Sequence, residues 1–175
     1  MHASLLNLAT ASAGLLVLRL VVGLLMAAHG SQKLFGWFGG HGIAGTSMFL
    51  ESIGFRPGRL FAPLAAATEL VSGLLVALGL LGPVGPALML SVMIVAAVSV
   101  HWKNGLFATS NGIEVALFYG TAAVGLALIG FGRYSLDALL GLQSLYTPAW
   151  AFVALAIGIV GGVGNLLARR PVAAA

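Results

Sequence analysis

The sequence contains no cysteine, and this absence excludes several kinds of chemistry. Disulfides, thiolate metal sites, iron–sulfur clusters and thiol–disulfide exchange all need a cysteine side chain. If the protein takes part in redox chemistry, a bound cofactor, a quinone or a partner protein must therefore carry the electrons.

Charged residues are also scarce. Only 7% of the 175 residues are charged and 60% are hydrophobic, whereas soluble domains carry about 25% charged residues. This composition predicts an integral membrane protein, and the length suits one compact domain. The eight Lys and Arg residues include no basic run long enough to follow a phosphate backbone, so we expect no nucleic-acid partner.

Long apolar stretches occur five times, and each can cross about 30 Å of hydrocarbon at about 1.5 Å per residue. They cover residues 12–32, 60–82, 84–102, 112–131 and 148–168. The first has no basic segment before it, so we expect an uncleaved helix that serves as the insertion signal. The pattern predicts an all-α integral membrane fold.

Residues 33–59 interrupt this pattern because they are rich in glycine and aromatic residues. The segment is too apolar for a solvated loop and too interrupted for a membrane span. Irregular backbone at membrane depth is tolerated only where protein or a cavity surrounds it. We therefore predict a lid in the headgroup layer, with a short helix over residues 46–52.

Basic residues are distributed unevenly between the two ends of the predicted helices. With five crossings, the side opposite the lid has only Arg133, and the lid side has six basic residues. Because cytoplasmic loops are enriched in Lys and Arg, we expect the lid side to face the cytoplasm. The six are Lys33, Arg56, Arg59, Lys103, Arg169 and Arg170.

Polar residues inside the predicted spans each need a physical reason. Arg19, His29 and Lys33 lie along one broad stripe of the first helix, and Glu69 lies on a face of small residues in the second. A lone carboxylate at that depth is unfavourable, so Glu69 needs a partner. Arg19 and His29 bracket its depth, and the sequence leaves both open as that partner.

Two more polar residues, His101 and Glu114, are expected at the lid side, at the end of the third helix and the start of the fourth. We expect both to converge with His29, Lys33 and Glu69. A buried set of histidine, lysine and glutamate beneath an aromatic lid can bind and move a proton near neutral pH. We predict catalytic roles for Glu69, His29 and Lys33, and ligand-binding roles for Arg19, Trp37, His101 and Glu114.

Structural roles compete with these assignments. Arg19 and Glu69 could form only an ion pair that locks the bundle, and Glu114 could act only as a helix cap. Lys33, Trp37 and Trp102 could be interface anchors. The histidines could face a haem iron, but no ligand spacing supports this, so we expect neither haem nor a metal site.

Three segments resemble the DoxX family of membrane proteins, in the family's order. They are HGSQKLFGWFGG at 29–40, which follows Arg19 and Gly23, then TELVSGLLVALG at 68–79, and GFGRYSLD at 130–137. Glu114 fits the family's fourth helix, so the resemblance covers about residues 15–140. It implies a four-helix transmembrane bundle over residues 12–140, with the lid at 33–59. The apolar segment at 147–170 is an additional membrane helix that departs from the pattern.

The resemblance also implies a function. DoxX proteins are described as oxidoreductases or membrane subunits, and some are similar to the membrane part of a thiosulfate:quinone oxidoreductase. The resulting hypothesis is a quinone-linked subunit of the bacterial cytoplasmic (inner) membrane, with membrane lipid, a quinone and soluble redox proteins as partners. The alternatives are a non-catalytic binder of a lipid-like small molecule, and a scaffold that docks soluble proteins on Arg56, Arg59 and Lys103.

Overall fold

The computed structural model describes residues 2–170, and the described chain is helical without a β-strand. A π-helical turn at Ala97–His101 and a 3₁₀ turn at Trp102–Asn104 continue the helix that begins at Val84 toward the lid side. The α-helices are α1 (His2–Phe35), α2 (Gly42–Ser52), α3 (Gly58–Leu78), α4 (Val84–Ala96), α5 (Glu114–Ile129), α6 (Leu136–Leu139) and α7 (Pro148–Leu167).

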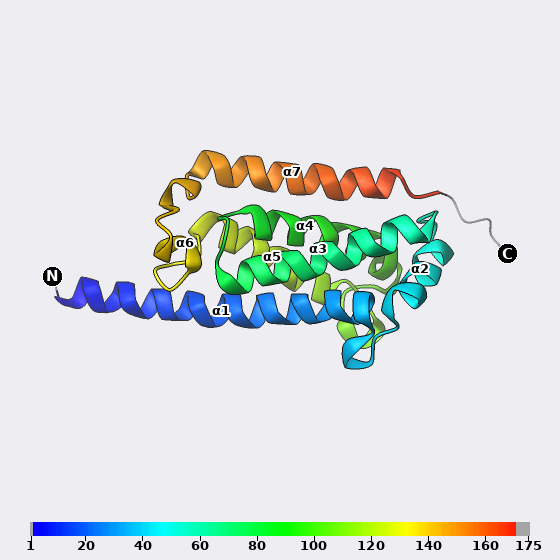
Figure 1. Ribbon diagram of the computed structural model, residues 1–175, viewed down its shortest axis with the longest axis horizontal. Helices are drawn as coiled ribbons and strands as arrows, with labels where there is room; N and C mark the ends of the chain where they lie inside the picture. Colours follow the sequence, from blue (N-terminus) through cyan, green and yellow to red (C-terminus); the bar gives the residue numbers. More distant parts are fainter. Residues whose placement is uncertain (1, 171–175) are drawn as a thin grey trace.

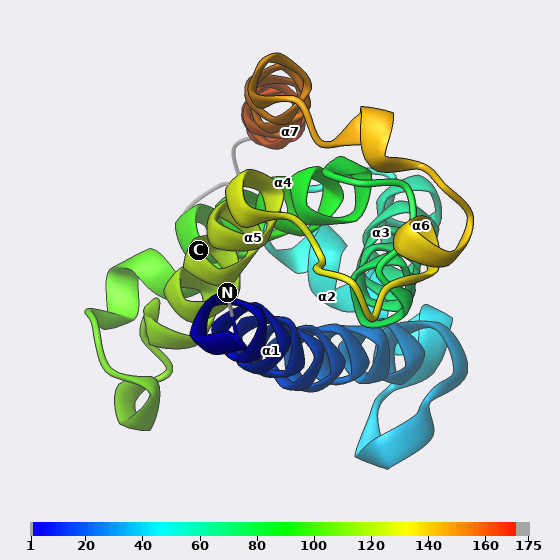
Figure 2. The same ribbon diagram turned by 90° about the vertical axis from the view of Figure 1, so that its left-hand side faces the viewer.

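The long helices run side by side along one axis (Figure 1). Seen from the end, α1, α3, α4 and α5 form a four-helix bundle, and α7 lies outside it against α4 (Figure 2). Four helical segments are long and apolar enough to cross a membrane, namely 7–35, 58–78, 84–104 and 148–167. The apolar helix α5 is shorter, at 16 residues. The predicted all-α membrane bundle is confirmed, and the chain is a multi-pass membrane protein.

Helix boundaries differ from the predicted ones at two places. Helix α1 begins at His2 instead of near Ser12, because the leucine- and alanine-rich start of the chain favours helix as strongly as the span does. The lid helix α2 begins at Gly42 instead of near Thr46. Gly42 has a φ of +65°, so the chain turns there and leaves the whole of 42–52 free to form a helix.

Close packing between α1 and α3 sets the geometry of the bundle. A Cβ atom added to Gly23 would lie 2.4 Å from the backbone nitrogen of Ala77, and one added to Gly73 would lie 2.4 Å from that of Ala27. Gly30 is equally close to Leu70. Small residues at these positions let the two backbones touch, as is typical of helix pairs in membranes.

Helix α7 packs on α4 by the same means. A Cβ atom on Gly158 would lie 2.4 Å from the carbonyl oxygen of Ala87, and one on Gly162 would lie 2.9 Å from that of Ser91. Pro148 opens α7 at a position where its missing N–H costs nothing. The additional C-terminal helix is therefore fitted closely to the bundle.

The end of the chain binds the lid. The Arg169 side chain donates a hydrogen bond from Nε to the carbonyl oxygen of Ile53 at 2.5 Å. The backbone N–H of Arg170 donates to Gly54 at 2.8 Å. The N-terminus of α1 and the end of α7 lie at opposite ends of the molecule (Figure 1).

Candidate functional site

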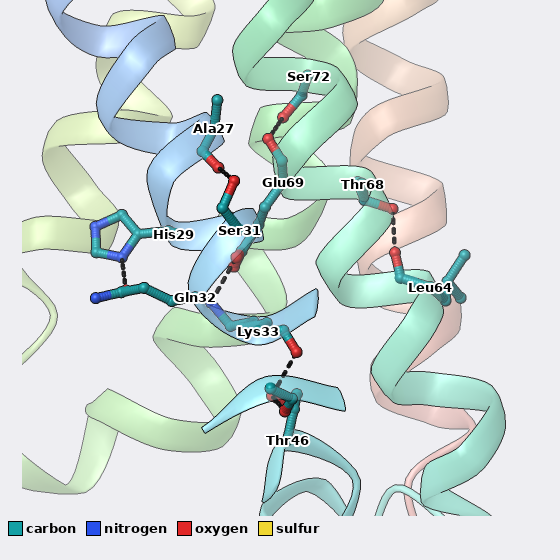
Figure 3. Close-up of polar contacts among 11 residues, drawn as sticks. Ala27, His29, Ser31, Gln32, Lys33, Thr46, Leu64, Thr68, Glu69 and Ser72 are labelled. Carbon is teal, nitrogen blue, oxygen red and sulfur yellow. Dashed lines mark hydrogen bonds and ion pairs between the residues drawn. The ribbon is translucent and has the colours of Figure 1, made fainter. Parts of the chain in front are cut away.

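The carboxylate buried inside the bundle, Glu69, is paired with Lys33. The Lys33 Nζ atom lies 2.5 Å from Glu69 Oε2, and the pair joins α1 to α3 (Figure 3). The Glu69 side chain is 5% exposed, whereas that of Lys33 is 34% exposed. The pair therefore links the interior of the bundle to its surface at the lid end.

Helix geometry explains why these two residues meet. Side chains on a helix lean toward its N-terminus. Because α1 and α3 run in opposite directions, Lys33 leans into the membrane from the end of α1 and Glu69 leans toward the lid from the middle of α3. A lysine near a helix end usually extends outward to the headgroup layer. Lys33 extends inward instead, and the Glu69 carboxylate is the reason.

The lid covers this pair. The Thr46 hydroxyl of α2 donates hydrogen bonds to the carbonyl oxygens of Lys33 at 3.2 Å and Gly42 at 2.8 Å. Between α1 and the lid lies a pocket of about 290 Å³. Its walls contain both polar and apolar side chains, and Lys33 is its cationic group. The lining residues are Gln32, Lys33, Gly39, Gly40, His41, Gly45, Thr46 and Phe49.

His29 and Gln32 form a second polar contact on α1, next to Lys33 in the sequence. The His29 Nδ1 atom lies 3.2 Å from Gln32 Oε1, a contact in which the histidine donates when that nitrogen is protonated. Gln32 also donates from Nε2 to the carbonyl oxygen of Phe38 at 3.1 Å, which ties it to the lid. The His29 ring projects away from Glu69 toward α5 (Figure 3).

Tyr119 of α5 is a site residue that the sequence reasoning missed. Its ring meets His29 edge-on, with the ring centroids 5.9 Å apart. Tyr119 is the one polar aromatic residue in the apolar segment 112–131, and this was the feature of the sequence that could have identified it as a site residue. The side chains of the candidate site therefore come from α1, α3 and α5, and α2 covers the site at the lid end.

Neither of the two partners that the sequence left open for Glu69, Arg19 and His29, pairs with it, because Lys33 does. The Arg19 guanidinium donates hydrogen bonds to the carbonyl oxygens of Ala77 and Tyr134, at the opposite end of the bundle from the lid. The 14 residues between Arg19 and Lys33 correspond to about 21 Å along α1. The last carbonyls of α3 have no partner within that helix, and they attract a cation. Arg19 is buried and locks this end of the bundle.

His101 and Glu114 do not converge on Glu69 either. The His101 Nδ1 atom lies 2.8 Å from the carbonyl oxygen of Asn111. Glu114 accepts a hydrogen bond from the backbone N–H of Ala108 at 2.7 Å. Both side chains therefore hold the loop between α4 and α5, because the local unpaired backbone groups of that loop outcompete a distant partner.

The two predicted lid-side tryptophans are exposed and lie outside the polar cluster. Trp37 packs on Phe35, with the ring centroids 4.8 Å apart. Trp102 begins the 3₁₀ turn of the α4 extension and lines an apolar groove against α5. Both positions fit aromatic anchors in the headgroup layer better than ligand-binding groups.

A second buried carboxylate, Asp137, lies at the end opposite the lid. It is fully buried and accepts hydrogen bonds from the backbone N–H groups of Leu81 and Gly82, at 2.9 and 2.7 Å. The Tyr146 hydroxyl donates a third, at 2.6 Å. Burial raises the pKa of Tyr146, and the hydrogen bond to Asp137 raises it further. With these partners, Asp137 fixes the turn between α3 and α4.

Metal binding finds no support among residues 2–170, where no group of three or more His, Asp or Glu side chains could hold an ion.

Comparison with known proteins gives a family and nothing finer. No curated protein and no solved structure matches the chain. The DoxX family model matches residues 14–102, from the first span through the end of the α4 extension. That region contains Arg19, the Lys33–Glu69 pair, the lid and His101, and it spans half of the chain. The protein is a member of the DoxX family.

Proposed function

We propose that this protein is the membrane subunit of a quinone-linked oxidoreductase in the bacterial inner membrane, with the Lys33–Glu69 pair at its quinone site. The observation that carries this proposal is a buried ion pair whose cationic member reaches the lid pocket. A quinone head group needs a hydrogen-bond donor at its carbonyl oxygens and a route for protons. A fixed ammonium group between the bundle interior and the lid side meets both needs.

The redox chemistry would belong to the quinone, which takes up two electrons and two protons to become a quinol. A soluble partner protein would supply the electrons, because the chain has no cysteine to ligate an iron–sulfur cluster. Lys33 would hold a proton at Nζ beside the head group, and its ion pair with Glu69 would fix the position of that ammonium group. The lid would limit the access of water to the pair.

Equilibrium binding of a short-tailed quinone to purified protein in lipid nanodiscs tests the proposal. Glu69→Gln keeps the shape of the side chain but removes the negative charge that positions Lys33. We expect at least a tenfold weaker affinity in this variant. Glu114→Gln is the matched control, because Glu114 binds the loop of α4 and α5. Equal affinities in all three proteins would overturn the proposal.

The second candidate function is non-catalytic binding of a lipid-like molecule. The specific observation in its favour is an open apolar groove of about 450 Å³ between α4 and α5. This groove lies apart from Lys33 and Glu69, so a ligand there would be insensitive to Glu69→Gln. A bound phospholipid in both wild type and variant, with no quinone binding, would favour this function over the first.

A further inference from the structure

Helices α1 and α5 are neighbours in the bundle but touch at few residues, in contrast to the close α1–α3 pair. The seam between them holds an open apolar groove of about 220 Å³. Its walls are the side chains of Leu18, Val21, Val22, Leu25, Phe118, Tyr119 and Ala122. The seam is therefore one of the loosely packed sides of the bundle, and its groove is open toward the surroundings of the bundle.

Tyr119 belongs both to this groove and to the polar cluster. Its ring lines the groove and contacts His29. No hydrogen bond joins its hydroxyl to another residue of the described chain. A tyrosine hydroxyl inside a membrane protein usually has a partner. Tyr119 is thus a free donor at the point where the apolar groove meets the polar site.

The groove is apolar along its length, and Tyr119 is its one polar lining residue. From Leu25 to Leu18 it follows α1 away from the lid for about 10 Å. The Tyr119 hydroxyl is the hydrogen-bond donor on its wall, and the Tyr119 ring contacts His29 of the polar cluster. The Glu69 carboxylate is already paired. The fitting ligand is therefore one with acceptor oxygens on its head and a single apolar tail.

We infer that the α1–α5 seam is the lateral access route and tail-binding groove for the ligand, and that Tyr119 is a positioning residue that donates to its head group. This inference rests on the proposed quinone site and adds the direction from which the ligand arrives. A polyprenyl tail would lie in the groove, while the lid side remains the aqueous side of the pair.

Binding measurements with two quinones that differ only in tail length test this inference separately from the proposed quinone site. Ala122→Trp fills the groove and leaves every residue of the polar cluster unsubstituted. We expect it to weaken binding of a long-tailed quinone at least tenfold and to leave binding of a one-isoprene quinone within twofold. Leu128→Trp is the matched control, because Leu128 is exposed on the same helix outside the groove.

Tyr119→Phe removes only the hydroxyl. We expect about tenfold weaker binding of both quinones, as for one lost hydrogen bond. If wild type binds neither quinone, the proposed function fails. If wild type binds both and Ala122→Trp behaves as Leu128→Trp does, the quinone site stands and the access route is overturned. Unchanged affinity in Tyr119→Phe would overturn the role of Tyr119.

Discussion

Lys33 and Glu69 lean toward each other across the α1–α3 interface, and their charged atoms meet at 2.5 Å. The rest of that interface consists of backbone packed on backbone through glycine and alanine. The close packing around Glu69 holds the charged pair in place. Loss of one member alone leaves an uncompensated charge inside the bundle.

Removal of one member of the pair should therefore cost more than removal of both. Lys33→Met leaves the Glu69 carboxylate buried without a counterion, which destabilises by about 3 kcal/mol. The double variant K33M/E69M removes both charges and keeps similar volumes, so we expect stability near that of wild type. Thermal midpoints in detergent provide the measurement. A double variant less stable than Lys33→Met would contradict this account of the pair.

The glycine contacts between α1 and α3 give a second prediction. Gly23→Ala forces a methyl group against the α3 backbone, and we expect a loss of about 1–3 kcal/mol. Gly14→Ala is the control in the same helix, because nothing lies within 4 Å of its added Cβ atom. That change should be neutral or stabilising. Similar midpoints for the two variants would show that the interface is looser than described.

The bundle itself was predictable because the length of each apolar stretch, and the face on which its small residues lie, can be read from the sequence of one helix alone. The partner of Glu69 was not, because partner choice depends on how α1 slides along α3. Gly23, Gly30 and Gly73 set that register and bring Lys33 level with Glu69, while Arg19 stays with the carbonyls at the far end of α3. Periodicity within one helix contains no information on this register.

The two failures at the lid side have a related cause. His101 and Glu114 were expected at the lid side because each lies at that end of its predicted helix. The loop between α4 and α5 offers them unpaired backbone groups, and they bind these instead. Tyr119 escaped notice because a tyrosine in an apolar segment resembles a core aromatic residue. Its role became visible only when the structure placed it beside His29.

Tyr146 predicts a dependence of stability on alkaline pH. Its folded-state pKa is raised above the value of about 10 for a free tyrosine. The folded protein therefore holds this proton when the unfolded chain has begun to lose it. Stability from this group is fully present below about pH 10 and decreases as the pH rises above that value. The midpoint of wild type should fall more steeply there than that of Tyr146→Phe, and parallel profiles would contradict the assignment.

The contact between the chain end and the lid predicts a change in lid mobility. Because the protein has no native cysteine, Thr46→Cys places a single thiol on the buried face of the lid helix α2. Arg169→Ala in this background removes the hydrogen bond to Ile53, and we expect maleimide labelling to become at least threefold faster. Arg59→Ala is the control, since Arg59 is exposed on the same side. Equal labelling rates in both backgrounds would show that Arg169 does not restrain the lid.

The central claim is that the Lys33–Glu69 pair holds a quinone. Its most direct test is mass spectrometry and absorption of protein purified gently from its own membrane, with wild type beside Glu69→Gln and Glu114→Gln. The account predicts a quinone in wild type and Glu114→Gln that is lost in Glu69→Gln. A quinone retained equally in all three, or phospholipid as the sole bound molecule in wild type, would contradict it.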